Sequence, residues 1–166
     1  FHGESESGKS LLAQIEAVRL IEDGKRVLYI DFESDAASVA MRLQEFGASR
    51  ASIVERFTYL NPEVKPESVK ELSAWIDVLK VRYDLAVIDG VTDALGIWGC
   101  SIQDNDDIAK WCRDMPNKIA KRTGAAVTMN EHVTKNADTR GRFAIGGQAK
   151  LAGLTGAGYT IEANPP

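Results

Sequence analysis

The sequence contains little cysteine and no long apolar run. Only Cys100 and Cys112 are cysteines, and their spacing matches no metal-binding motif. We therefore expect reduced thiols in a cytoplasmic protein. No run of about 18 apolar residues occurs, so we expect no membrane-spanning helix and no membrane partner. The first residues also lack the basic and then apolar segments of a secretory signal.

A strong charge of either sign is absent too. The 166 residues carry a formal net charge of −4, which argues against a protein that binds a polyanion over its whole surface, although a local basic patch stays compatible with it. Neither an internal repeat nor a low-complexity tract is present. A hydrophobic content of 44% is typical of a globular protein. We expect one domain spanning residues 1–166.

Hydrophobic periodicity predicts helices that alternate with strands. Pro116 is expected to split or kink the last helix, and residues 90–107 and 133–150 are predicted to form long loops. Strands are expected at residues 26–33, 56–61, 85–89, 125–129 and 158–163, and helices at residues 9–23, 35–46, 72–79 and 106–122. This alternation predicts an α/β fold with a mostly parallel sheet that carries helices on both faces.

The opening "FHGESESGKS" carries the most specific motif, G-x-x-x-x-G-K-[ST]. Its glycines let backbone N–H groups point at phosphate oxygens, and the helix that follows adds its positive N-terminal end. The lysine reaches the outer phosphates of a nucleotide and the serine hydroxyl ligates Mg²⁺. The bland alternative is a Gly/Ser-rich turn before a helix. The predicted ATP contacts are Gly3, Glu4, Ser5, Glu6, Ser7, Gly8, Lys9, Ser10 and Leu11.

A phosphate loop normally follows a strand, and this chain begins almost at the loop. We therefore expect a fragment of a longer protein that lacks its first core strand. "LAVIDG" reads as a buried strand that ends on Asp89, where a carboxylate would hold Mg²⁺. The alternative for Asp89 is a cap on the next turn. Many ATPases place a water-activating glutamate directly after this aspartate, but here the residue is Gly90.

The missing base is expected at the end of another strand. "VLYIDFESD" carries Glu33 just past its strand, where a water beside the γ-phosphate would sit. We interpret Glu33 as the general base, with Glu131 the next candidate. The alternative is an acid at the start of the following helix, where Ser34 and Asp35 are also able to cap.

A base on the strand after the first helix resembles the RecA-like group of P-loop ATPases. Within that group, "VLYIDFESD", "MRLQEFG" and "TMNEHVTK" resemble the RepA-type hexameric replicative helicases of plasmids and phages. The resemblance implies a RecA-like fold, an ATPase that uses ATP and Mg²⁺, a homo-oligomeric ring and single-stranded DNA as partner.

The resemblance also assigns catalytic roles. It implies that Lys9 contacts the phosphates, Glu33 is the base and His132 senses the γ-phosphate. The segment "TRGRFAIGGQAK" lies where such proteins place an arginine finger, with Arg142 first, Arg140 second and Lys150 weaker. Alternatives without a catalytic role stay open: His132 as a surface histidine at a strand end, and Arg140 and Arg142 as solvated loop residues. Alternative functions are a small-molecule P-loop kinase, disfavoured by the lack of an arginine-dense lid, and a non-catalytic nucleotide-binding assembly module.

Overall fold

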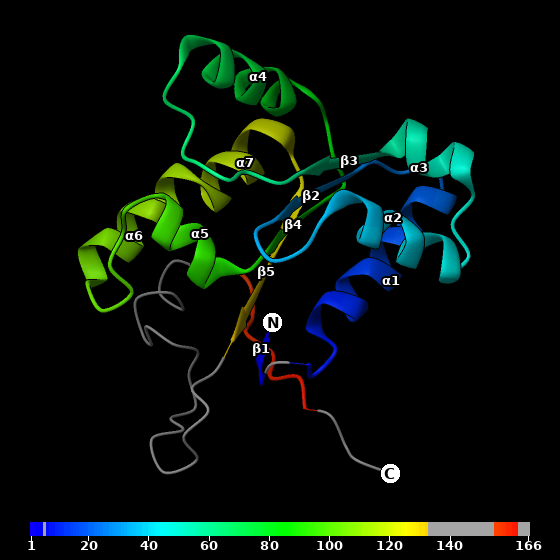
Figure 1. Ribbon diagram of the computed structural model, residues 1–166, viewed down its shortest axis with the longest axis horizontal. Coiled ribbons are helices and arrows are strands. Elements are labelled where there is room, and N and C mark those ends of the chain that lie inside the picture. Colours follow the sequence, from blue (N-terminus) through cyan, green and yellow to red (C-terminus); the bar gives the residue numbers. More distant parts are fainter. Residues whose placement is uncertain (5, 133–154, 163–166) are drawn as a thin grey trace.

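A five-stranded parallel sheet organises the computed structural model, which describes residues 1–4, 6–132 and 155–162 (Figure 1). The strand order is β1-β5-β4-β2-β3, and every neighbouring pair is parallel. The bounds are β1 His2–Gly3, β2 Val27–Asp31, β3 Phe57–Leu60, β4 Leu85–Asp89 and β5 Ala126–His132. The predicted α/β fold with a parallel sheet is confirmed.

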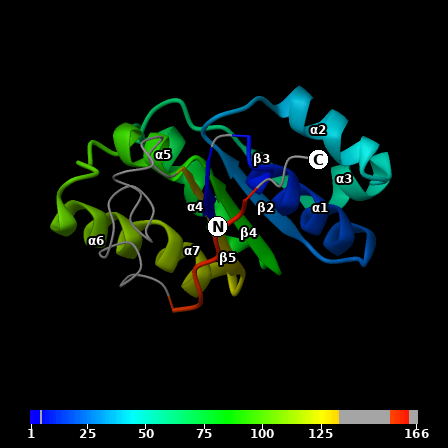
Figure 2. The same cartoon turned by 90° about the horizontal axis from the view of Figure 1, so that it is seen from below.

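Helices cover both faces of the sheet. Figure 2 shows α1, α2 and α3 on one side and α5, α6 and α7 on the other. The bounds are α1 Lys9–Glu22, α2 Ala36–Glu45, α3 Arg50–Arg56, α4 Val69–Lys80, α5 Val91–Ile97, α6 Asn105–Asp114 and α7 Pro116–Thr123. Pro116 is the first residue of α7, so the predicted helix over residues 106–122 is split there, as expected.

Strand alternation sorts the core into two clusters. All residues of β2 and β4 are buried, as expected for strands covered on both faces. Tyr29 and Val87 pack with α1 and α2, whereas Leu28 and Ile88 pack with α5, α6 and α7. The two apolar layers pack against β2 and β4 from both sides. This packing fixes the backbone at the carboxyl ends of the two strands, where the polar residues lie.

Two short helices were missed by the periodicity analysis. Ser49 caps α3 by accepting a hydrogen bond from the N–H of Ser52. Helix α5 occupies the first part of the loop predicted over residues 90–107 and begins after Gly90. Both helices have only seven residues, too few for helical periodicity to stand out.

The edge of the sheet beside β1 corrects three expectations. Two residues of the strand that we expected to be missing are present, because His2 and Gly3 pair with Glu131 and His132 of β5. Strand β5 runs on to His132 instead of ending at residue 129. The strand predicted over residues 158–163 is reduced, among its described residues, to one bridge between Thr160 and His2.

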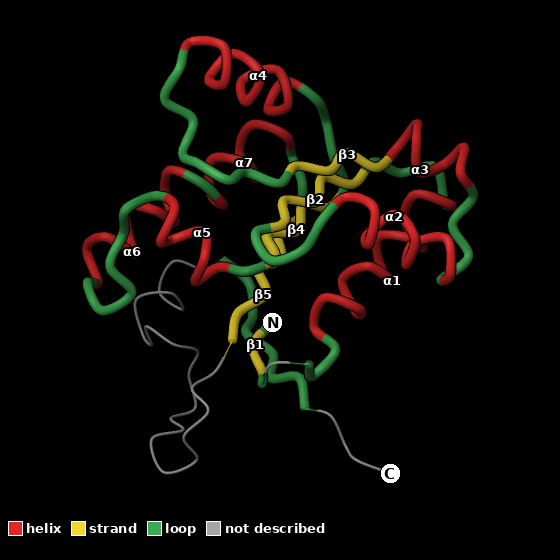
Figure 3. The backbone as a smooth tube through the Cα atoms, in the orientation of Figure 1, coloured by secondary structure: helices red, strands yellow, loops and turns green. Residues whose placement is uncertain are grey.

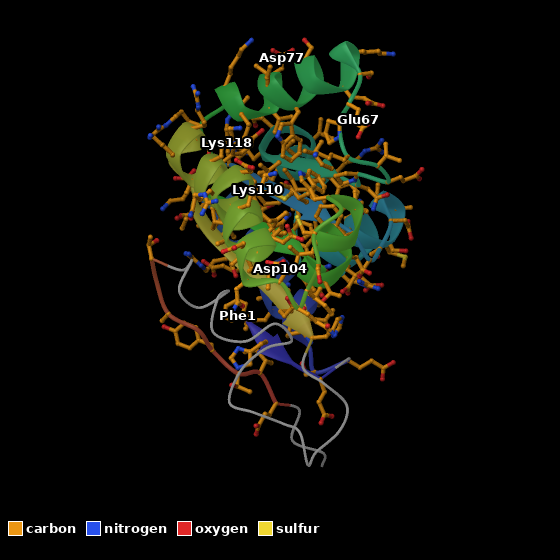
Figure 4. The ribbon with its side chains drawn as sticks, turned by 90° about the vertical axis from the view of Figure 1, so that its left-hand side faces the viewer. Phe1, Glu67, Asp77, Asp104, Lys110 and Lys118 are labelled. Atoms are coloured by element: carbon orange, nitrogen blue, oxygen red, sulfur yellow. The ribbon has the colours of Figure 1, made fainter. Side chains whose placement is uncertain are left out.

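Helices α6 and α7 carry charged side chains on their outer surface. Figure 4 labels the exposed side chains of Lys110 and Lys118, which belong to α6 and α7, and Asp104 at the start of α6. Asp104 accepts from two N–H groups of α6, so this aspartate of the acidic 101–107 stretch is a helix cap. Trp98 packs edge-on against Phe32, with ring centroids 5.9 Å apart. In the described ranges, no helix is long and apolar enough to cross a membrane.

Helix α2 offers a matched test of the packing. Leu43 is fully buried against the sheet, whereas Met41 on the same helix is 58% exposed. Leu43→Ala should lower the free energy of unfolding by about 2–5 kcal/mol, because it leaves a cavity in the core. Met41→Ala should change it by no more than about 0.5 kcal/mol. Urea unfolding measures both, and equal losses would contradict the assigned faces of α2.

Candidate active site

The Gly-rich loop closes tightly between β1 and α1. Gly8 is the N-cap of α1, so the 14-residue helix points its free N–H groups at the loop. A Cβ on Gly3 would lie 2.2 Å from the carbonyl oxygen of Ile161 and 2.8 Å from Ser7 Oγ. A larger residue than glycine therefore does not fit at the start of the loop.

Lys9 folds its ammonium group into the loop. Its Nζ donates to the carbonyl oxygens of Gly3 at 3.0 Å and Glu4 at 2.6 Å, and to Ser7 Oγ at 3.2 Å. Burial lowers the pKa of Lys9, while the nearby carboxylates of Glu33 and Asp89 oppose that shift. The cation is thus held where the loop would receive phosphate groups, at the place the motif predicts.

The Asp89 carboxylate lies at the end of β4 and is 3% exposed. Its Oδ1 accepts from Ser10 Oγ at 3.0 Å and from Asn130 Nδ2 at 2.9 Å. Its Oδ2 accepts from the hydroxyl of Tyr29. A buried carboxylate needs such donors, and these come from α1, β5 and β2. The predicted pair of Ser10 and Asp89 is therefore brought together.

Glu33 and His132 also meet, although 99 positions separate them in the chain. His132 Nε2 lies 2.9 Å from Glu33 Oε1, and both side chains are about one-third exposed. Burial raises the pKa of Glu33, and the charge of His132 opposes that rise. A raised pKa suits a carboxylate that must take a proton from water. The capping alternative for Glu33 is not met, because Asp35 accepts from the first N–H groups of α2.

Gly90 explains why no glutamate follows Asp89. Its φ of +85° lies in the left-handed region, which residues with a Cβ rarely adopt. A Cβ added there would lie 2.7 Å from Cγ and 3.1 Å from Oε1 of Glu33. The space beside Asp89 is therefore filled by the side chain of Glu33, which follows β2. A Cβ at position 90 would therefore require Glu33, which follows the neighbouring strand β2, to move.

Other predicted residues are placed differently. The side chain of Leu11 is 43% exposed. Glu131, the second candidate base, is 5% exposed and accepts from the hydroxyl of Thr92 at 2.5 Å. Ser5, Arg140, Arg142 and Lys150 lie outside the described residues.

Sequence reasoning missed Tyr29 and Asn130. Tyr29 looked like an ordinary strand residue and Asn130 lay just past the strand predicted over residues 125–129, and the role of each depends on which strands are neighbours. Asn130 gave no separate signal, because its burial and its place in β5 appear only in the structure. Tyr29 lies two residues before Asp31 in β2, as any residue of an apolar strand would, and gave no separate signal.

The donor set fits Mg²⁺. Ser10 and Asp89 offer two hard oxygen ligands, and the ion typically takes its remaining ligands from phosphates and water. Among the described residues, no group of three or more His, Cys, Asp or Glu side chains forms a metal site.

Comparison with known proteins gives the family. A family model described as an AAA domain matches residues 1–138. The chain belongs to this AAA-domain family. It is also similar to the DNA repair protein RadA of Brucella abortus (strain 2308), with 29% identity over 139 residues. That alignment covers 84% of the chain and 29% of the RadA protein's length. With the parallel sheet, these matches support a RecA-like P-loop ATPase domain.

A single substitution tests the arrangement around Gly90. Gly90→Ala should push Glu33 from its place and lower the ATPase kcat by about 10²-fold, the scale of a lost general base. The KM for ATP should stay within about twofold, because the phosphate loop is untouched. Steady-state ATPase kinetics measure both quantities.

The matched control is Gly24→Ala. Gly24 has a φ of +80°, and no atom lies within 4 Å of its added Cβ. The Gly24→Ala substitution therefore introduces the same kind of backbone strain without touching Glu33. Equal effects of the two substitutions on kcat would show that strain, and not displacement of Glu33, explains the loss.

Proposed function

We propose that this ATPase domain is the motor of an oligomeric, single-stranded-DNA-dependent ATPase of helicase type, similar to the RepA-type replicative helicases. The observation that carries the proposal is the contact between Glu33 and His132 beside the phosphate loop. In this proposal Glu33 activates water and touches His132, which reports on the γ-phosphate. A module that only binds nucleotide has no need for this pair.

The hydrolysis step uses groups that the fold brings together. Lys9 leaves the loop carbonyls and pairs with the outer phosphates of ATP. Glu33 orients the attacking water and accepts its proton as the oxygen bonds to the γ-phosphorus. The bond to the bridging oxygen breaks, and ADP leaves with the electron pair. Mg²⁺, when held by Ser10 and Asp89, neutralises charge on the phosphates.

His132 links this step to a partner. Its Nε2 contacts Glu33, and its place at the last residue of β5 puts it directly before residues 133–150. We propose that these residues contact DNA and supply an arginine finger, Arg142 or Arg140, to the neighbouring subunit's nucleotide. The homo-oligomeric ring and the DNA strand are part of this proposal. The similar RadA protein is named for DNA repair, which supports a role on DNA.

Removal of the proposed base gives the first test. Glu33→Gln keeps the size of the side chain and should lower kcat by about 10²-fold or more. Affinity for ATP should be retained, because the loop and Lys9 are unchanged. Lys9→Ala is the contrast, since it should lose binding or turnover with the charge that faces the phosphates. Unchanged hydrolysis in Glu33→Gln would pass the base role to another residue.

The DNA-dependent part needs its own test. Single-stranded DNA should stimulate ATP turnover by the wild-type protein. His132→Ala should keep ATP affinity and lose most of that stimulation, because the contact that reports on the nucleotide is gone. Filter binding with and without a non-hydrolysable ATP analogue measures the coupling directly. Wild-type turnover that ignores DNA would favour the kinase or assembly alternatives.

A further inference from the structure

The turn that carries Glu33 is shaped by the side chain of Asp31. Asp31 Oδ1 accepts from the backbone N–H groups of Glu33 at 2.9 Å and Ser34 at 3.0 Å. This carboxylate is 1% exposed and ends β2. Such a bond to the chain two residues ahead closes an Asx turn. The direction in which Glu33 leaves the sheet therefore depends on how the Asp31 carboxylate is oriented.

Tyr59 of β3 and Asn61, the first residue after β3, hydrogen-bond to that turn. The hydroxyl of Tyr59 lies 3.1 Å from Asp31 Oδ2 and 3.3 Å from the carbonyl oxygen of Ser34. Asn61 Nδ2 donates to the carbonyl oxygens of Asp31 at 2.8 Å and Ser34 at 3.1 Å. One tyrosine and one amide thus hold both residues that bracket Glu33. The partners in these hydrogen bonds are Asp31 and Ser34, not the carboxylate of Glu33.

We propose that Tyr59 and Asn61 are positioning residues for Glu33. The proposal rests on the proposed function, in which Glu33 is the base. The carboxylate of Glu33 is confined by His132 on one side and Gly90 on another. The hydrogen bonds from Tyr59 of β3 and from Asn61 just after it hold the backbone on either side of Glu33. Loss of these bonds lets the turn relax and moves the carboxylate away from the water.

Two substitutions and a matched control test this role. Tyr59→Phe and Asn61→Ala should each lower kcat by about 10-fold, because small displacements of a catalytic group cost that much or more. The KM for ATP should stay within about twofold. Tyr83→Phe is the control, since the hydroxyl of Tyr83 lies 3.3 Å from Thr58 Oγ1 on the same strand. This substitution removes a tyrosine hydroxyl that contacts β3 without touching the turn, and it should leave kcat unchanged.

A double-mutant cycle separates positioning from a general structural effect. Each substitution is repeated in the Glu33→Gln background, and residual single-turnover rates are compared. A residue that acts through the Glu33 carboxylate should change the residual rate by less than about twofold there. The same 10-fold loss in both backgrounds would overturn the proposal. If Asn61→Ala unfolds the protein, Tyr59→Phe carries the test alone.

The outcomes also separate this inference from the proposed function. Full turnover in Glu33→Gln would remove the base assignment and the positioning role with it. A large loss in Glu33→Gln with no loss in Tyr59→Phe and Asn61→Ala would overturn only the positioning role. Lower kcat in all three variants, with effects that are not additive in the double-mutant cycle, would support both the base assignment and the positioning role.

Discussion

A buried carboxylate must be surrounded by donors, and this constraint organises the site around Asp89. Its partners Ser10, Asn130 and Tyr29 come from α1, β5 and β2, so one side chain ties the phosphate loop to three strands. The hydroxyl of Tyr29 is itself fully buried, and burial beside Asp89 raises its pKa, which keeps it a donor. Any movement of the loop relative to the sheet would disturb these bonds.

The second constraint is the division of acidic residues between two strands. Asp31 and Asp89 are register partners at the carboxyl ends of β2 and β4, and the loops that leave these strands start side by side (Figure 3). The left-handed Gly90 leaves room for the Glu33 side chain above β4. The Asp89 carboxylate thus ends β4, and the Glu33 carboxylate follows the neighbouring strand β2.

The two constraints meet in the hydrogen bonds of the neighbouring aromatic residues. The rings of Tyr29 and Tyr59 stack with centroids 6.3 Å apart, and each hydroxyl faces one of the two aspartates. Each of the two buried carboxylates accepts a hydrogen bond from a tyrosine hydroxyl in place of water. Burial raises the pKa of both tyrosines. The two tyrosines therefore belong to the apolar cluster on this face of the sheet and carry their hydroxyls to aspartates of two adjacent strands.

Prediction from sequence succeeded where the signal is local. The phosphate-loop spacing, the apolar run of β4 and the break at Pro116 each depend on a few neighbouring residues. It failed for α3 and α5, which are too short to show a period. It also failed at the edge beside β1, where pairing of His2 with Glu131 and Thr160 depends on segments far apart in the chain.

For the site, the sequence by itself determined the chemical groups: a lysine and serine in a phosphate loop, an aspartate at a strand end, and a glutamate and histidine after two others. Only the tertiary structure decided which of them touch. Contact between Glu33 and His132, and the exclusion between Gly90 and Glu33, follow from β2, β4 and β5 lying side by side. The spacing of residues along a chain carries no distance between strands, because hydrogen bonding across the sheet sets that distance.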